Sequence, residues 1–343
     1  MNRQAGAQTF AKPEGIDVDD LRRAIPRGRK LTETLLMSTF SIVAADVDRQ
    51  QVGVAVQSKY FAVGAVVPWA RAGVGAVATQ ALGLANYGPT ILDLLAGGEN
   101  PAAALKQALA PDALASRRQI GLVRADGEAA SHTGADCLFW AGGRTGPGYA
   151  VQGNILAGPD VVDEMARAFT TAPGTLAERL VTSLEAGQAA GGDSRGQQSA
   201  AVIVEQAGYR DLGSEGIDRV VDLRVDDHPS PIVELRRLLD LRLRQEVSSR
   251  AMRHYNQADF AAAAAVMAAG DARFPNSADI LYNLACFESL SGDSAGALRH
   301  LSESIALDPS FRALAEKDTD FDPLRTLPAF LRLVAGAQHP GRS

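Results

Sequence analysis

The chain has 343 residues, 46% apolar and 22% charged, so we expect a packed globular protein of about two domains. Its net charge of −6 gives no reason to expect nucleic-acid binding. The two cysteines, Cys137 and Cys286, form no C-x-x-C motif, which points to a reducing compartment. No apolar run of about 18 residues and no secretory signal is visible. We therefore expect a cytoplasmic protein without a membrane span.

Residues 1–36 differ in composition from the rest of the chain. They are rich in Arg, Asp and Pro, and basic residues cluster between Arg22 and Lys30. We expect a flexible N-terminal extension, either a disordered tail or the product of an upstream start codon. A propeptide is the alternative.

From Thr39 to about Tyr209, short β-branched segments alternate with helical ones. The strands come mostly in adjacent pairs and so do the helices, which favours antiparallel sheets covered by helices, an α+β fold. Neither a dinucleotide-binding nor a P-loop glycine motif occurs, so we expect no cofactor. The predicted strands are 39–46, 52–58, 73–79, 118–124, 129–133, 148–153 and 199–204, and the predicted helices are 86–96, 101–109, 159–171 and 174–188.

From about Pro231 the chain is predicted to be helical to its end. Ala263, Met267 and Pro275 lie 34 residues before Ala297, Leu301 and Pro309, a spacing that resembles the tetratricopeptide repeat (TPR). Two repeats cannot bury a solenoid core alone, so this TPR-like domain is expected to pack on the preceding domain. It is either a structural cap or dimer arm, or a partner-binding groove. We therefore expect domains at 37–230 and 231–343.

Polar residues gather beside glycines at several predicted strand ends. Taken singly, each group has a structural explanation: strand propensity for Thr39, solvation for Lys59, helix capping for Asn86 and loop chemistry for Asp193. Gln198 and Ser199 are harder to dismiss, because they lead into an apolar strand and buried polar groups need partners. The groups are Ser38, Thr39 and Asp46; Gln57, Ser58 and Lys59; Thr79, Gln80, Asn86 and Tyr87; Gln152 and Asn154; and residues 191–199.

Several of these segments together resemble a known family. The chain is similar to domain-of-unknown-function family 1028 (DUF1028), placed in the N-terminal-nucleophile (Ntn) hydrolase superfamily. The likeness covers about residues 38–240 and excludes the repeat region. It is carried by Thr39–Ala44, Val54–Lys59, Val66–Gln80, His132–Gly134, Gln152–Gly158, Ala190–Ala200 and Asp222–Pro229.

The resemblance implies a four-layer αββα sandwich and an amidohydrolase in which Thr39 is the nucleophile. In such enzymes the hydroxyl attacks a carbonyl, and the free α-amine of the same residue carries the proton. Backbone N–H groups near Gln80 and Ala81, at the start of the following helix, are expected to hold the oxyanion. Lys59 is expected to lower the pKa of the α-amine, with Asp193 beside the nucleophile. Residues expected to line the pocket are Gln57, Ser58, Thr79, Gln80, Asn86, Tyr87, His132, Gln152, Asn154, Arg195, Gln198 and Ser199.

Ser38 marks a departure from the family pattern, in which Met directly precedes the Thr. Removal of Met37 exposes Ser38 and not Thr39, so Ser38 is a competing nucleophile with the same combination of hydroxyl and amine. If Met1 is the start, cleavage before Ser38 or Thr39 is required.

A metal site is the alternative for Asp226, Asp227 and His228, with His132. The spacing from His132 to Cys137 is not a zinc spacing, and no second His lies near His228. Helix capping explains at least one of the two aspartates, so we expect no metal.

The sequence thus predicts an N-terminal-nucleophile amidohydrolase that cleaves a C–N bond of a small amide, peptide-like or ureido compound. We expect a homo-oligomer, no nucleic-acid or membrane partner, and a protein partner only through the TPR-like segment. The alternative is a non-catalytic scaffold of the same fold whose repeats bind a partner.

Overall fold

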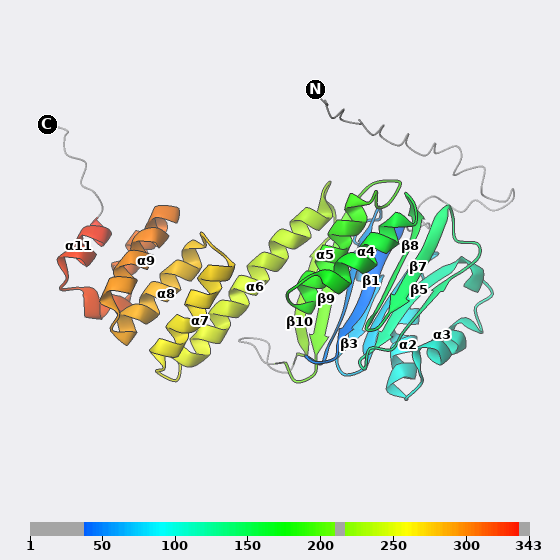
Figure 1. The fold of residues 1–343 in the computed structure, drawn as a ribbon, viewed down its shortest axis with the longest axis horizontal. Helices are drawn as coiled ribbons and strands as arrows, with labels where there is room; N and C mark the ends of the chain where they lie inside the picture. The colour runs from blue at the N-terminus through cyan, green and yellow to red at the C-terminus, as the bar shows by residue number, and fades with distance from the viewer. Residues whose placement is uncertain (1–37, 210–216, 336–343) are drawn as a thin grey trace, which may run out of the picture. The chain divides into compact units, whose positions relative to one another are not determined.

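The computed structural model describes residues 38–209 and 217–335. These residues form two compact units that meet within one helix, α6 (Pro231–Tyr255): one unit ends at Leu238 and the other begins at Leu239. The first is a mixed α/β unit with two antiparallel sheets, and the second is helical (Figure 1).

The larger sheet has six strands in the order β10-β9-β2-β1-β8-β7, all antiparallel to their neighbours. The pair β1 and β2 lies at its centre, and all residues of β1 are buried, because the smaller sheet covers one of its faces and a helix the other. The strands are β1 (Thr39–Asp46), β2 (Gln51–Ser58), β7 (Trp140–Gly146), β8 (Tyr149–Leu156), β9 (Ser199–Gln206) and β10 (Arg219–Val225).

The smaller sheet has four antiparallel strands in the order β3-β4-β5-β6. It packs face to face on the larger sheet, with β4 and β5 over β1. One end of the space between the sheets is apolar, with Val43, Val54, Ala78 and Val123 in contact. These strands are β3 (Pro68–Arg71), β4 (Gly75–Ala81), β5 (Arg118–Arg124) and β6 (Ala129–Thr133).

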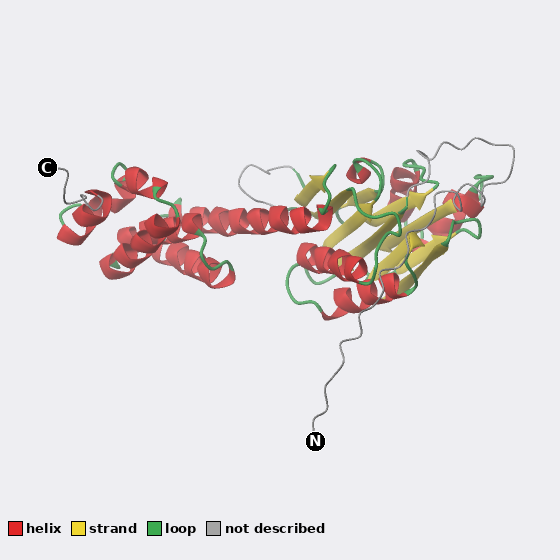
Figure 2. Ribbon diagram, turned by 90° about the horizontal axis from the view of Figure 1, so that it is seen from above, coloured by secondary structure: helices red, strands yellow, loops and turns green. Residues whose placement is uncertain are grey.

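Helices cover the outer faces of both sheets (Figure 2). Helices α2 (Tyr87–Ala96) and α3 (Pro101–Leu109) pack on the smaller sheet, where Ile91 and Leu95 contact Ile120 and Leu122. Helices α4 (Asp160–Thr171) and α5 (Leu176–Ala189) pack on the larger sheet. The start of α5 is fixed by a reciprocal capping box between Thr175 and Glu178.

The helical unit continues from α6 through a series of antiparallel helix pairs. Its core contains Met267, Leu284, Leu301, Phe321 and Phe330. Gly292 ends α8 in the left-handed conformation, φ 92°, that glycine adopts without strain. The helices are α7 (Phe260–Arg273), α8 (Ala278–Ser291), α9 (Ser294–Leu307), α10 (Ser310–Ala315) and α11 (Pro328–Ala335), with a 3₁₀ helix at Thr319–Leu324.

The predicted elements of the first unit are present within a few residues of their expected ends, and three strands were not predicted. Strand β7 contains three glycines, which strand propensity disfavours. Strand β3 has four residues and begins with Pro68, and β10 carries charged residues at an edge of its sheet. In the described ranges, no helix combines the length and apolar character needed to cross a bilayer. The predicted extension at 1–36 lies outside the described residues.

Candidate functional site

Thr39 begins β1, and the register places it between two polar residues. It lies opposite Ser58 of β2 on one side and Asn154 of β8 on the other. Residues opposite one another in a sheet share a face, and here that face is the one turned toward the smaller sheet. The side chains of all three residues are buried.

Ser58 joins the Thr39 side chain to the preceding peptide bond. Its Oγ lies 3.1 Å from Thr39 Oγ1 and donates a 2.5 Å hydrogen bond to the carbonyl oxygen of Ser38. One hydroxyl therefore contacts both the potential nucleophile and the carbonyl that immediately precedes it.

Three amide side chains converge on the carbonyl oxygen of Thr39 or on one another. Gln80 Nε2 of β4 donates to Thr39 O over 3.2 Å, and Asn154 Nδ2 donates to the same oxygen over 3.5 Å. Both groups also donate to Gln119 Oε1 of β5, over 2.9 and 3.0 Å. The start of β1 is thus held by side chains from both sheets.

Two further side chains extend this group along β1. Ser41 Oγ donates to Gln80 Oε1 over 2.6 Å, and Gln152 Nε2 of β8 donates to Ser41 Oγ over 2.6 Å. The carboxamide of Gln152 lies over Gly121, where a Cβ atom would collide with it. Gly121 therefore makes room for a glutamine from the opposite sheet. We call Thr39, Ser41, Gln80, Gln119, Gln152 and Asn154 the inter-sheet polar cluster.

The inter-sheet polar cluster is costly to bury and is almost fully hydrogen-bonded. Each of its six side chains is at most 1% exposed. An unsatisfied buried amide or hydroxyl costs about 1–3 kcal/mol, so such a cluster persists only when its members satisfy one another. One buried side-chain oxygen in the cluster, Gln152 Oε1, has no hydrogen-bond partner within the described residues.

Asp193 lies beside Ser38, the residue that precedes Thr39. Its carboxylate accepts hydrogen bonds from the backbone N–H groups of Lys59 and Arg195, over 3.1 and 2.8 Å. Burial raises the pKa of the Asp193 carboxyl above its usual range, while the neighbouring Ser38 hydroxyl, the two N–H groups and the Arg195 charge oppose that shift. Asp193 is therefore placed to hold a proton or a charge next to residue 38.

Comparison with known proteins is consistent with this architecture. The model of the family of unknown function DUF1028 matches residues 39–235, which is more than half of the chain. The chain belongs to this family.

A crystal structure of a DUF1028 protein from Silicibacter pomeroyi is similar to this chain in fold and sequence. The two share 29% sequence identity, with a TM-score of 0.54, over 59% of this chain and 84% of that one. A search of curated proteins finds no match. The DUF1028 match begins at Thr39 and ends inside α6, so the inter-sheet polar cluster lies within it and the other helices of the second unit do not.

In this DUF1028 chain the predicted site residues separate into groups. The structure brings Thr39, Ser58, Gln80, Gln152 and Asn154 together between the sheets. It places Ser38 and Arg195 beside Asp193. Lys59 contributes its backbone N–H to this second group, but its exposed side chain donates to the Gln197 carbonyl. Among the described residues, no contact therefore supports the predicted effect of Lys59 on the Thr39 amine.

Other predicted residues lie away from Thr39 because the strand alternation turns them outward. Gln57 faces the opposite side of its sheet from Ser58, and its Nε2 donates to Gly196 O over 3.5 Å. Thr79 bonds Leu84 O within its own turn, and His132 bonds Ala115 O on the outer side of the smaller sheet. Sequence proximity to a cluster residue does not place a side chain in the cluster.

The remaining predicted residues have structural partners of their own. Asn86 is exposed and bonds Thr90 Oγ1, and Tyr87 bonds Asp112 Oδ2. Ser199 accepts from Val63 N and donates to Tyr60 O, which fixes the loop after β2. Gln198 donates to Asp227 on the surface. None of these contacts involves Thr39.

Sequence reasoning missed Ser41, Gln119 and Thr133. Gln119 Nε2 donates to Gly153 O and to Thr133 Oγ1, over 2.7 and 3.0 Å, so it connects the cluster to β6 and β8. A glutamine near the start of an otherwise apolar strand was the available signal, together with the alternation of Thr39 and Ser41 on one face of β1.

The expected oxyanion position differs from the structure. Gln80 and Ala81 end strand β4, and α2 begins only at Tyr87, so these residues are not at a helix start. Ala81 and Ile155, which directly follow Gln80 and Asn154, have φ values of 68° and 55°. Left-handed backbone at non-glycine residues costs about 1–3 kcal/mol and concentrates at functional sites. Both strained residues adjoin cluster amides.

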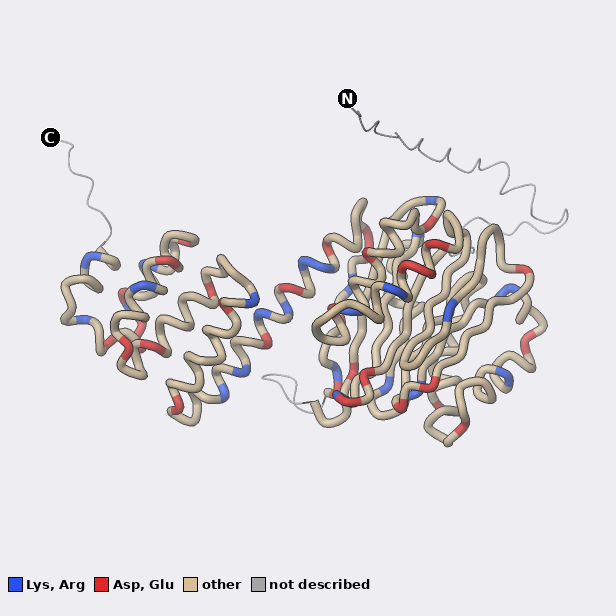
Figure 3. The backbone as a smooth tube through the Cα atoms, in the orientation of Figure 1, with Lys and Arg blue, Asp and Glu red and all other residues tan. Residues whose placement is uncertain are grey.

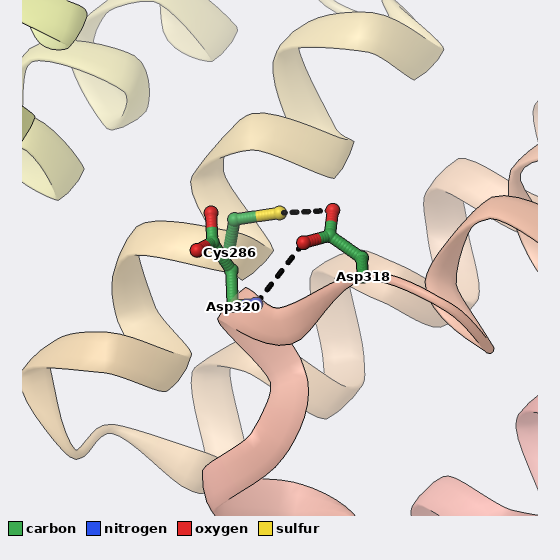
Figure 4. A group of neighbouring side chains, drawn as sticks. All are labelled: Cys286, Asp318 and Asp320. Atoms are coloured by element: carbon green, nitrogen blue, oxygen red, sulfur yellow. Dashed lines mark hydrogen bonds between the residues drawn. The ribbon is translucent and has the colours of Figure 1, made fainter.

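Cys286, Asp318 and Asp320 form a group in the helical unit with the chemistry of metal ligands (Figure 4). Hydrogen bonds explain the group: Tyr282 donates to Asp318 and Tyr255 to Asp320, over 2.8 and 3.0 Å. Burial raises the pKa of the Cys286 thiol, and the two aspartates add to the shift, which keeps the thiol protonated. The contacts are those of a structural network, and nothing else in the described part of the chain points to a cation there.

Proposed function

We propose that this protein is an N-terminal-nucleophile amidohydrolase. Thr39 attacks the carbonyl carbon of a small amide, peptide-like or ureido compound, and the C–N bond of that compound breaks. The observation that carries the proposal is the contact of Ser58 with both Thr39 Oγ1 and the Ser38 carbonyl. The order of layers, helices, sheet, sheet, helices, with a hydroxyl residue at the start of a central strand, also resembles that superfamily.

The proposed mechanism needs a free α-amine on Thr39, so the Ser38–Thr39 bond must break. Thr39 Oγ1 attacks the Ser38 carbonyl carbon, an ester forms, and the C–N bond breaks as the hydroxyl proton passes to the Thr39 nitrogen. Water then hydrolyses the ester, which leaves a Ser38 carboxylate and a free Thr39 amine. The Ser58 hydroxyl, bonded to the Ser38 carbonyl oxygen, stabilises the charge that develops there.

The same groups then act on the substrate. The Thr39 hydroxyl attacks the amide carbon, and the α-amine accepts the proton and passes it to the leaving nitrogen. Water releases the acyl group from Thr39. The place that Ser38 leaves lies beside Asp193 and the Lys59 N–H, so the acyl part of the substrate takes that place. Gln80 and Asn154 hold the Thr39 carbonyl and thereby orient the nucleophile.

Thr39 is favoured over Ser38 as the nucleophile by the orientation of the two hydroxyls. Thr39 Oγ1 faces the Ser58 hydroxyl within the space between the sheets. Ser38 Oγ points toward the carbonyl oxygens of Asn154 and Ile155, over 3.4 and 3.5 Å, and toward Asp193. Of the two hydroxyls, only that of Thr39 contacts Ser58, and Ser58 also bonds the Ser38 carbonyl that must be attacked.

Intact-mass spectrometry of the purified full-length chain tests the proposal. The wild-type protein is expected to yield a mature chain that begins at Thr39, and Thr39→Ala is expected to retain the full mass. Ser38→Ala is the matched control and should still yield the Thr39 terminus. A mature chain beginning at Ser38 would transfer the role to Ser38. A catalytically active preparation that retains residues 1–38 would reject the free-amine mechanism.

A scaffold function is the second candidate, and the helical unit favours it. Helices α7 and α9 present Ala263 and Met267, and Ala297 and Leu301, at equivalent buried positions, which agrees with a TPR-like arrangement. An unprocessed, inactive chain that binds a protein through a surface sensitive to substitutions in α7 or α9 would favour this function. The homo-oligomer stays a prediction that size-exclusion chromatography with light scattering would test.

A further inference from the structure

Ser38 occupies the place that the acyl part of the substrate takes in the proposed reaction, after residues 1–38 have left. The residue is fully buried, and its carbonyl oxygen accepts the hydrogen bond from the Ser58 hydroxyl. Because a seryl group already fills this place, its contacts are ones that an acyl group of the same size reaches. The surroundings of the Ser38 side chain therefore indicate which acyl group fits.

Three hydrogen-bond acceptors lie next to the Ser38 hydroxyl. The carbonyl oxygens of Asn154 and Ile155 lie 3.4 and 3.5 Å from Ser38 Oγ, and the Asp193 carboxyl is the third acceptor. The two backbone N–H groups beside Asp193 donate to its carboxylate. The position of Ser38 Oγ therefore favours a group that donates a hydrogen bond.

The loop that carries Asp193 is fixed to the end of β8. Asp193 forms a β-bridge with Leu156, and the backbone N–H of Ser194 donates to Ile155 O over 3.0 Å. The carboxylate and the Ile155 carbonyl are thus held in place by the backbone. Acceptors that are held before a ligand arrives lose little conformational freedom when it binds, so they favour a donor strongly.

The charge balance favours a neutral donor over a cation. Arg195 Nε lies 3.8 Å from Asp193 Oδ1, and the two side chains are 22% and 0% exposed. The guanidinium compensates the carboxylate, so an ammonium would add an uncompensated charge to a buried place. In Figure 3 the strands of the first unit are mostly tan, with charged residues mainly at turns and on helices. A hydroxyl group meets these conditions.

We propose that the substrate is an amide of a β-hydroxy acid and that Asp193 selects its hydroxyl group. The substrate carbonyl takes the position of the Ser38 carbonyl next to Ser58, and its β-hydroxyl takes the position of Ser38 Oγ. Thr39 Oγ1 attacks the carbonyl carbon, an ester forms, and the C–N bond breaks as the nitrogen leaves with the hydroxyl proton of Thr39. Water then hydrolyses the ester and releases the β-hydroxy acid. This inference rests on the proposed function and names its substrate class.

Hydrolysis of four matched amides by the wild-type chain, after its own maturation, tests this proposal. The probes are N-acetyl-L-serinamide, N-acetyl-L-alaninamide, N-acetyl-O-methyl-L-serinamide and the α-N-acetyl amide of L-diaminopropionic acid, which differ only in the group on Cβ. The alanine and methyl ether probes lack the donor, and the diamino probe carries an ammonium in its place. We expect kcat/KM, measured by ammonia release, to be at least about tenfold higher for the serinamide than for each of the others.

Maturation of the full-length chain gives a second readout without added substrate, because the acyl group of residue 38 is the first to be cleaved. Ser38→Thr keeps the β-hydroxyl, and Ser38→Val has the same shape without it. We expect Ser38→Val to form the Thr39 terminus at least about tenfold more slowly than Ser38→Thr. The measurement is a time course of intact mass after refolding.

A substitution at Asp193 tests whether this residue selects the hydroxyl group. Asp193→Asn replaces a charged acceptor by a neutral one, so the ratio of kcat/KM between the serinamide and the alaninamide should fall at least about threefold. Asp227→Asn is the matched control, at an exposed aspartate that Gln198 contacts on the surface, and should leave this ratio unchanged. An unchanged ratio in Asp193→Asn would remove Asp193 from the proposed role.

Equal hydrolysis of the serine and alanine amides, faster hydrolysis of the methyl ether or the diamino amide, or equal maturation rates of Ser38→Thr and Ser38→Val would each overturn the inference. A chain that matures at Thr39 and hydrolyses none of the four amides rejects the inference alone. A wild-type chain that never forms the Thr39 terminus rejects the proposed function, and the inference falls with it.

Discussion

Ser41 donates a 2.6 Å hydrogen bond to Gln80, and this contact joins the two sheets by polar side chains at a depth where neither is exposed. At the other end of the same interface Val43 and Ala78 meet as apolar residues. The space between the sheets is therefore divided along its length. One half is an apolar core, and the other half consists of the buried, hydrogen-bonded side chains of the inter-sheet polar cluster.

Gln80 and Gln57 provide a direct test of that division. Both side chains are fully buried, but Gln80 makes four hydrogen bonds and Gln57 makes one long one, with its Oε1 unpaired in the described structure. Gln80→Met should lower the free energy of unfolding by about 3–5 kcal/mol, because it orphans Ser41 and Gln119. Gln57→Met should change it by less than about 1 kcal/mol.

Urea unfolding followed by tryptophan fluorescence measures this difference in stability in the first, α/β unit. The two tryptophans of the chain, Trp69 and Trp140, lie in β3 and β7, so fluorescence reports on the sheets. Equal destabilisation by the two substitutions would show that burial of an amide, and not the hydrogen bonds of the cluster, decides stability here.

Ser58 and Ser199 lie opposite one another in β2 and β9. They allow a matched test of the proposed cleavage between Ser38 and Thr39. Ser58→Ala should slow formation of the Thr39 terminus by about 100-fold, because it removes the donor to the Ser38 carbonyl. Ser199→Ala should leave that rate unchanged and cost about 1 kcal/mol of stability through its lost bonds to Tyr60 and Val63.

The measurement is a time course of intact mass after refolding of the full-length chain. Equal slowing by both substitutions would mean that folding of the β2–β9 region, and not chemistry at Ser38, controls the reaction.

Much of this arrangement follows from the sequence, and the reasons are local. Strands such as β1 and β5 have β-branched residues and clear ends, and α5 has its capping box, so their positions follow from short-range patterns. Strand β7 is glycine-rich and forms because β8 offers it an edge. The face of the sheet toward which the Gln57 or His132 side chain points depends on strand pairing, and a pattern of residue types does not fix that pairing.

Gly121 and Gln152 are predicted to be energetically coupled. A Cβ at residue 121 would occupy the position of the Gln152 carboxamide, so Gly121→Ala should cost about 1–3 kcal/mol. In a Gln152→Ala background the space is free, and the added methyl group should be tolerated. A double-mutant cycle by urea unfolding should therefore give a coupling of at least about 1 kcal/mol, and additive effects would contradict the contact.

The Asp112–Arg118 ion pair predicts a pH dependence of stability at acid pH. The Arg118 guanidinium, with a second hydrogen bond from Tyr87, lowers the pKa of Asp112 from 3.8 to about 2. Because the folded-state pKa is depressed, the stabilisation is fully present above about pH 4 and is lost as pH falls through about 2. Asp112→Asn should cost about 1–3 kcal/mol at pH 7.

Urea midpoints between pH 7 and pH 2 measure this effect. The difference between wild type and Asp112→Asn should narrow as the pH falls below 4. A difference that stays constant down to pH 2 would show that the charge of Asp112 does not contribute. Asp126→Asn, at an exposed carboxylate with a depressed pKa, is the control and should have a smaller effect.

Cys286 is predicted to be a probe of the helical unit. The residue is 3% exposed, and burial raises the pKa of its thiol, so a maleimide should not label it in the native chain. In a Cys137→Ser background, labelling should begin only at urea concentrations that unfold the helices. Rapid labelling in native buffer, or protection by added Zn²⁺, would contradict the assignment of Cys286 to a hydrogen-bonded network.

Ser38 and Thr39 are both fully buried, although the bond between them is the one proposed to break. A separate protease binds its target as an accessible, extended segment, and the folded sheets do not offer this bond in that form. Maturation then has a fixed order: the sheets assemble first, and the folded chain then cleaves its own Ser38–Thr39 bond. Any delay in folding becomes a delay in activity, and a molecule that misfolds never acquires its nucleophile.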